Sequence, residues 1–144
     1  MIGKTRKVFA LVLLVTLICV TMVAYAAERE IQNYDFDLTT TSESNQRLGG
    51  PAFKVRTQSV PAVVRCDYFN GQHTVKYTIW TGDEYDAICL TNEAWLMTGR
   101  RNMYYQGTIS NINLIPHYLA GRKNTNETPG MYIRAYGTWS PDDN

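Results

Sequence analysis

The cysteines are the residues whose number and spacing most directly suggest chemistry. Cys19 falls in an apolar N-terminal run, and Cys66 and Cys89 follow in the body of the chain. If the N-terminal run is removed on export, the two remaining thiols most simply form one disulfide. Such a bond would close a loop of about 24 residues and stabilise the fold by roughly 3 kcal/mol. The alternative is two free buried thiols, which pack as small hydrophobic side chains.

The histidines show no spacing that is typical of catalysis or of a metal site. His73 and His117 are 44 positions apart, and neither has a ligand-type residue two or four positions later. The chain contains neither a Gly-x-Ser-x-Gly motif nor a cysteine in a catalytic signature. We therefore expect both histidines at the surface or rim of the fold, and we predict no enzyme activity, catalytic residue, metal ligand or cofactor.

Three acidic residues gather in one turn-like segment, Asp83, Glu84 and Asp86. Carboxylates this close can bind Ca²⁺ through their oxygens, but the spaced Asp-x-Asp-x-Asp-Gly pattern is absent. A solvated turn is the simpler interpretation. A retaining-glycosidase pair would need two carboxylates about 5 Å apart, which sequence alone does not place.

Aromatic residues are abundant, with 10 tyrosines and three tryptophans, and several lie close to arginines. Aromatic faces beside arginine suit sugar stacking or protein interfaces. The alternative, which we favour, is that aromatic residues occupy strands because of their high β-propensity. The candidate binding surface comprises Arg100, Arg101, Tyr104, Tyr105, Tyr132, Arg134, Tyr136 and Trp139.

The strands that would position these side chains are organised around residues 66–89. Asn70-Gly71 is a signal for a two-residue type I′ turn, because both residues tolerate positive φ. Apolar and polar residues alternate over 63–68 before it and over 75–80 after it. The pattern predicts a hairpin of two neighbouring strands, followed by a third strand at 87–90.

Similar alternating runs recur along the rest of the chain, and no convincing helical period follows the N-terminal segment. The run at 34–38 has an acidic second face, which suits a sheet edge. We predict further strands at 53–57, 103–109 and 131–139, a turn at 98–102, polar loops at 39–50 and 121–130, and either a short helix or a strand at 92–97. The fold class is therefore all-β, a single small antiparallel β-sandwich or open barrel.

The N-terminus has the form of a secretory signal peptide. Basic residues among the first seven positions precede an apolar run at 8–23 and then Ala24-Tyr25-Ala26, a small-residue cleavage site. The apolar run of about 16 residues is shorter than the roughly 20 of a spanning helix, so an uncleaved anchor is the lesser alternative. We predict a signal helix at 1–26, cleaved, a single domain at 27–144, and a secreted or cell-wall-associated protein that meets the membrane only before cleavage.

The charge balance argues against nucleic acid as a partner. Three of the 14 Lys and Arg residues and none of the 13 Asp and Glu residues lie in the signal segment, so its removal changes the formal net charge from +1 to −2. Nucleic-acid-binding domains usually carry a basic stripe. Removing 26 of the 144 residues leaves 118, a length that suits one domain.

Two segments carry a resemblance to a known group of proteins. Tyr34-Asp35-Phe36-Asp37-Leu38 and the closing Tyr136-Gly137-Thr138-Trp139-Ser140-Pro141-Asp142, together with the export signal and a β-rich middle, resemble small exported β-rich proteins of Gram-positive bacteria that have no assigned function. The resemblance implies export and a β-rich fold, and it supplies no catalytic residues.

These observations predict a secreted, non-enzymatic β-sandwich that binds at or outside the cell envelope, in a bacteriocin-like or wall-interacting role. The expected partner is an extracellular protein or a wall glycan. Two alternatives stay open, a small secreted cell-wall hydrolase and a structural matrix or coat component.

Overall fold

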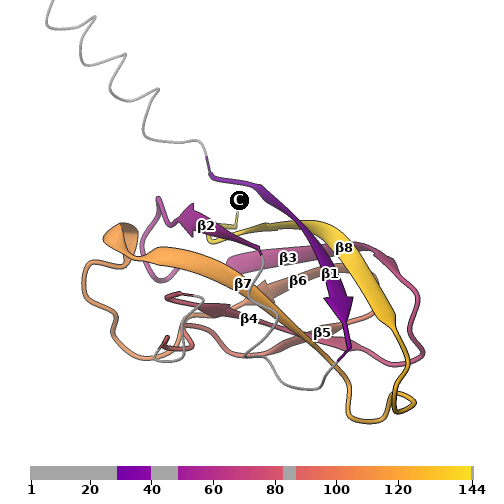
Figure 1. Cartoon of the computed structure of the whole chain (residues 1–144). Coiled ribbons are helices and arrows are strands. Elements are labelled where there is room, and N and C mark those ends of the chain that lie inside the picture. Colours follow the sequence, from indigo (N-terminus) through magenta and orange to yellow (C-terminus); the bar gives the residue numbers. More distant parts are fainter. Residues whose placement is uncertain (1–28, 40–48, 83–86, 144) are drawn as a thin grey trace, which may run out of the picture.

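The computed structural model describes residues 29–39, 49–82 and 87–143, which form eight β-strands and one short 3₁₀ turn, Ile112–Leu114 (Figure 1). The strands are β1 (Gln32–Leu38), β2 (Gly49–Phe53), β3 (Ala62–Phe69), β4 (Val75–Trp80), β5 (Ala94–Leu96), β6 (Gly99–Met103), β7 (Pro116–Lys123) and β8 (Ile133–Ser140). The predicted signal segment, most of the loop at 39–50 and the acidic residues 83, 84 and 86 lie outside the described residues. Within the described ranges, no helix is long and apolar enough to cross a membrane.

The strands form two antiparallel sheets that pack face to face. Sheet A has the order β1-β8-β3-β6, and sheet B has the order β2-β7-β4-β5. The sheets do not close into a barrel, so the structure confirms the predicted all-β sandwich. The first strand, β1, lies at an edge of sheet A beside the last strand, β8 (Figure 1), as its acidic second face predicts.

The hydrophobic core lies between the sheets and follows from the alternation within each strand. In β1, Tyr34, Phe36 and Leu38 are buried, whereas Asp35 and Asp37 are exposed. Burying one large apolar side chain contributes about 1.5–3 kcal/mol. A slip of one residue would turn this buried set to solvent, so the hydrophobic pattern fixes the register of β1 against β8.

Residues 70–74 form an arch between the sheets instead of the predicted hairpin. β3 belongs to sheet A and β4 to sheet B, so the two expected partners do not pair. Asn70 instead bonds to Arg134 of β8, donating its backbone N–H and accepting one with its side-chain carbonyl. The Glu127 carboxylate accepts two further backbone N–H groups of the arch, at 2.9 and 2.6 Å. These long-range bonds override the local turn propensity of Asn-Gly.

The same difference in topology removes the predicted disulfide. Cys66 lies on β3 in the core, whereas Cys89 forms an isolated bridge with Trp80 on the side of sheet B. The Sγ of Cys66 donates to the carbonyl of Tyr68 at 3.2 Å, and the Sγ of Cys89 donates to that of Thr91 at 3.4 Å. No disulfide joins the two cysteines; both thiols are free, and each donates to a carbonyl of its own segment. The prediction of a Cys66–Cys89 bond is wrong.

Several strand boundaries also differ from the predicted ones. The expected turn at 98–102 is strand β6, which begins at Gly99 with a φ of 95°. The expected strand at 87–90 contributes only an isolated bridge, and the strand expected at 53–57 lies earlier, at Gly49–Phe53. The ambiguous segment at 92–97 forms a strand, β5.

Candidate functional site

The side of sheet A that faces away from sheet B is called here the outer face of sheet A. Residues opposite one another in antiparallel strands project to the same face, about 4.5–5.5 Å apart. The strand registers place four rows on this face: Ser140, Val63 and Asn102; then Asn33, Thr138, Arg65 and Arg100; then Asp35, Tyr136 and Tyr68; then Asp37 and Arg134. The outer face is thus mainly polar and charged, with two tyrosines at its centre.

A β-bulge in β3 brings Tyr68 to the outer face. Strict alternation predicts Tyr68 on the same side as buried Cys66, but the register shifts between these two residues, so that Tyr68 stands opposite Tyr136. A bulge inserts one extra residue and re-aims the side chains that follow. The backbone of the bulge packs against Gly137, where any Cβ would clash with the Arg65 carbonyl oxygen.

The two tyrosine rings stack on each other. Their centroids lie 5.0 Å apart and their planes differ by 10°. The Arg134 guanidinium lies 5.8 Å from the centroid of the Tyr136 ring, within the range of a cation–π contact. Tyr68 is 41% exposed and Tyr136 is 40% exposed, so the stack presents aromatic surface to solvent while its members hold each other in place.

Arg134 also forms a two-pronged ion pair with Asp35 of the neighbouring strand. Its Nε donates to Oδ1 at 2.9 Å and its Nη2 donates to Oδ2 at 2.6 Å. These hydrogen bonds lower the pKa of the Asp35 carboxyl below its ordinary value. On β3, the Nε of Arg65 donates to Asp67 at 2.7 Å. The outer face therefore carries preordered carboxylates and guanidinium groups.

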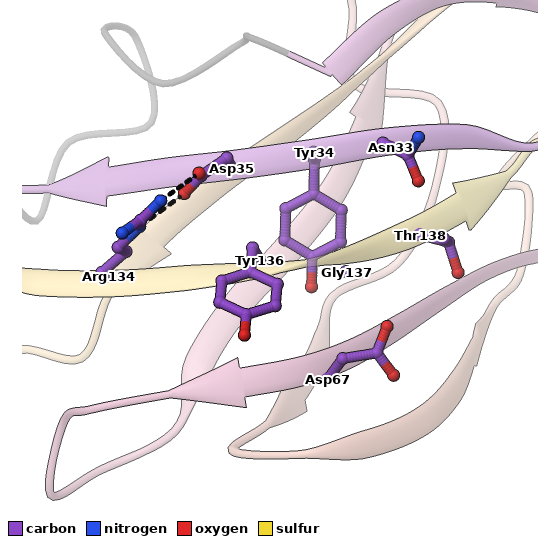
Figure 2. A pocket seen from close by; sticks show the side chains of 8 residues that line it. All are labelled: Asn33, Tyr34, Asp35, Asp67, Arg134, Tyr136, Gly137 and Thr138. Atoms are coloured by element: carbon purple, nitrogen blue, oxygen red, sulfur yellow. Dashed lines mark hydrogen bonds and ion pairs between the residues drawn. The ribbon is translucent and has the colours of Figure 1, made fainter.

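An open hollow of about 690 Å³ lies above β8 and is lined by Asn33, Tyr34, Asp35, Asp67, Arg134, Tyr136, Gly137 and Thr138. Figure 2 shows Asp35 and Arg134 paired at one end and Thr138 at the other, with Tyr136 beside the pair and Asp67 on the adjacent strand. The lining groups include donors, acceptors and an aromatic ring, all carried on three neighbouring strands. Groups held on a packed sheet lose little conformational freedom when a ligand binds.

The sequence-predicted surface is only partly brought together. Arg100, Arg134 and Tyr136 lie on the outer face of sheet A, and Tyr132 joins them by donating its hydroxyl to Asp37. Arg101 stands opposite the inward-facing Val64, and Tyr104 follows β6, outside the hollow.

Two members of the predicted surface point into the protein instead. Trp139 is 1% exposed and belongs to the core. Tyr105 is half-buried, and its hydroxyl donates to the Pro141 carbonyl at 2.9 Å. Both residues lie close to an arginine in the sequence, which suggests a shared surface. Spacing along the sequence does not reveal the direction in which a side chain points.

A second polar cluster is closed within the fold. Lys54 and Asp142 have fully buried side chains and form an ion pair at 2.7 Å. The Lys54 ammonium donates its other two hydrogen bonds to the carbonyls of Val60 and Pro141, and the Asp142 carboxylate accepts the backbone N–H groups of the two residues that follow Lys54. All three ammonium protons are used, so this pair anchors the closing segment of the chain and offers no open position to a ligand.

His117 lies next to this buried pair, and not at the surface or rim as expected. Its side chain has no exposed surface, and its Nδ1 lies 2.7 Å from the carbonyl oxygen of Ile115. Burial is the main cause that lowers its pKa from 6.5 to about 4. In this conformation His117 is closed to any substrate, whereas His73 is exposed, as predicted. Within the described ranges, no group of three His, Cys, Asp or Glu residues is arranged to hold a metal ion.

Sequence reasoning missed most of the residues around the hollow. Asn33, Asp35, Asp67 and Thr138 are ordinary polar residues, and the orientation of Tyr68, which stacks on the lining residue Tyr136, depends on the bulge. The polar face of the 34–38 run is the one available signal, and on sequence alone it indicates only a sheet edge. This polar face becomes part of the hollow only because β1 pairs with β8, a strand from a distant part of the chain.

Comparisons of the chain with protein-family models and with curated proteins, and of its structure with solved structures, find no match. The chemistry of the outer face of sheet A is therefore interpreted from its own residues.

Proposed function

We propose that the protein is an exported binding protein, without catalytic activity, that holds a glycan on the outer face of sheet A. The observation that carries this proposal is the hollow above β8, which is lined by Tyr136 and by the Asp35–Arg134 ion pair. Tyr68 does not line the hollow, but its ring stacks on that of Tyr136. Export rests on the predicted signal peptide and the resemblance to exported Gram-positive proteins.

The mixture of groups around the hollow favours a glycan over a protein partner. Sugar hydroxyls both donate and accept, so they match a site that combines two carboxylates, one guanidinium group and one amide. The exposed tyrosine surface can pack against the C–H face of a sugar ring. A protein interface would bury about 800 Å² on each side with a core depleted of charge. Here, charged Asp35, Asp67 and Arg134 surround the central Tyr136.

The same charges favour binding over hydrolysis. A glycosidase needs one carboxylic acid that stays protonated, with a raised pKa, beside a carboxylate. Arg134 instead lowers the pKa of Asp35, and Arg65 donates to Asp67. Neither of these carboxyl groups has the apolar surroundings that a general acid requires.

Calorimetric titration of the purified protein with a panel of soluble wall and capsule oligosaccharides tests the proposal. We expect Tyr136→Ala to weaken binding of the recognised sugar at least about tenfold, which corresponds to about 1.4 kcal/mol. Tyr104→Ala is the matched control, because Tyr104 is 58% exposed but lies outside the hollow. Circular dichroism establishes that both variants fold.

Two results would contradict the proposal. One is the absence of glycan binding together with specific capture of a protein through this face. The other is equal loss of affinity in the two tyrosine variants, which would place the sugar elsewhere. Release of shorter sugars during the titration would favour the hydrolase alternative.

A further inference from the structure

A second, more enclosed hollow of about 310 Å³ continues the outer face of sheet A beyond Thr138. Thr138 lines both hollows, and Figure 2 places it at the end of the first hollow that is away from Asp35 and Arg134. The two depressions therefore meet at Thr138. A polymer seated in the first would extend naturally into the second.

Three arginines line the second hollow, from three different parts of the chain. Arg29 precedes β1, Arg65 lies on β3 and Arg100 lies on β6, directly opposite Arg65. Like charges placed opposite one another across a sheet are unfavourable unless something neutralises them. The hollow thus concentrates positive charge at one end of an otherwise mixed face.

Acidic side chains neutralise two of these guanidinium groups in part. Arg65 donates to Asp67, and Arg100 forms an ion pair with Asp143. Arg29 forms no ion pair with any residue that the structure describes, and no acidic residue lines the hollow. Counted over the described residues alone, the second hollow therefore has an excess positive charge of about one.

A guanidinium group binds carboxylate and phosphate oxygens through parallel N–H groups, so an arginine-lined hollow suits an anionic group. The hydroxyl-bearing Thr138 and Ser140 also line this hollow. We propose that the ligand of the outer face of sheet A is an acidic glycan, whose carboxylate or phosphate group enters the second hollow while a neighbouring sugar ring contacts Tyr68 and Tyr136. This inference rests on the proposed glycan-binding function and specifies its substrate class.

The test compares two forms of the same ligand. The purified protein is titrated with oligogalacturonate and with its methyl-esterified, uncharged form, and separately with a phosphorylated oligosaccharide and its dephosphorylated, uncharged form. We expect at least one anionic ligand to bind about tenfold or more tightly than its own uncharged form, and we expect this preference to shrink as salt is added. The pair that shows the larger preference identifies the group as carboxylate or phosphate.

Matched arginine variants test whether the positive charge that attracts the ligand lies in the second hollow. Arg29→Gln should weaken binding of the anionic ligand about threefold to tenfold and leave binding of its uncharged form unaffected. Arg101→Gln is the control, because Arg101 neighbours Arg100 in β6 but does not line the hollow. Removal of Arg29 should not disturb folding, because it breaks no ion pair among the described residues.

The outcomes separate this inference from the function on which it rests. Equal affinity for anionic and uncharged forms overturns the acidic-glycan inference and leaves glycan binding intact. An equal effect of the two arginine variants also overturns it, because the attraction would then be non-specific. Failure to bind any glycan, charged or uncharged, overturns both.

Discussion

Tyr68 and Tyr136 stack across β3 and β8 with 5.0 Å between ring centroids, although strict alternation would bury Tyr68. Their contact depends on the bulge that follows Cys66, and the bulge depends on Gly137. The stacked tyrosines on the outer face of sheet A therefore depend on a backbone irregularity that no local sequence pattern predicts.

Gly137→Ala tests this dependence. The added Cβ would clash with the backbone carbonyl oxygen of Arg65, which cannot move aside as a flexible side chain could. We expect a loss of about 1–3 kcal/mol or more in the free energy of unfolding, measured by urea denaturation. Gly107→Ala is the comparison, because its φ of 68° carries a cost of about 1–2 kcal/mol but its Cβ would meet nothing within 4 Å. A Gly137→Ala protein as stable as the wild type would contradict the account of the bulge.

The Lys54–Asp142 pair predicts a large effect far from the hollow. Asp142→Ala would leave the fully buried Lys54 ammonium without its counter-ion, and breaking a buried pair in this way costs about 3–5 kcal/mol. Arg65→Gln breaks an ion pair whose side chains are exposed, and it should cost at most about 1 kcal/mol. Denaturant unfolding of both variants measures the difference, and similar costs would show that the closing segment is not anchored as described.

His117 predicts how stability changes with pH. Burial lowers its pKa from 6.5 to about 4, so between these values the unfolded chain binds a proton that the folded protein does not. The contribution of neutral His117 to the free energy of unfolding is fully present above about pH 6.5. It is lost as the pH falls towards 4, which lowers the free energy of unfolding by up to about 3 kcal/mol. The free energy of unfolding, measured at intervals from pH 4.5 to 7.5, should rise with pH. The slope of this rise should be smaller in His117→Gln. Identical slopes in the two proteins would assign the titration to another group.

The sequence was sufficient to predict the fold class and the first and last strands of the chain. Alternation in the 34–38 run correctly placed Tyr34, Phe36 and Leu38 in the core and β1 at a sheet edge, because one buried face imposes a period of two. The 131–139 run likewise corresponds closely to β8. The hydrophobic pattern of each of these strands lies within the strand itself, so each can be predicted without knowing which strands pair with it.

The pairing of elements was not predictable in the same way. Asn70-Gly71 has the propensity of a hairpin turn, but Arg134 and Glu127, more than 50 positions later, hold it as an arch. The error in the hairpin led directly to the error in the disulfide. The candidate site was missed for the same reason, because β1, β8 and β3 come together only through long-range pairing.

The structure makes a direct prediction about the cysteines. Cys66 and Cys89 are free thiols that donate to the carbonyls of Tyr68 and Thr91, so proteolytic digestion without reductant should yield no peptide in which they are linked to each other. Mass spectrometry of the digest, with and without reductant, checks this. A cross-linked peptide that disappears on reduction would mean that β3 and the segment after β4 lie closer than the structure places them.

The central claim is that a glycan occupies the hollow on the outer face of sheet A, and amide chemical shifts followed by NMR during a sugar titration test it most directly. The account predicts that the largest shifts arise from Tyr136, Thr138 and their neighbours on β1 and β3, with little change in sheet B. Shifts confined to sheet B, or shifts that persist unchanged in Tyr136→Ala, would contradict it.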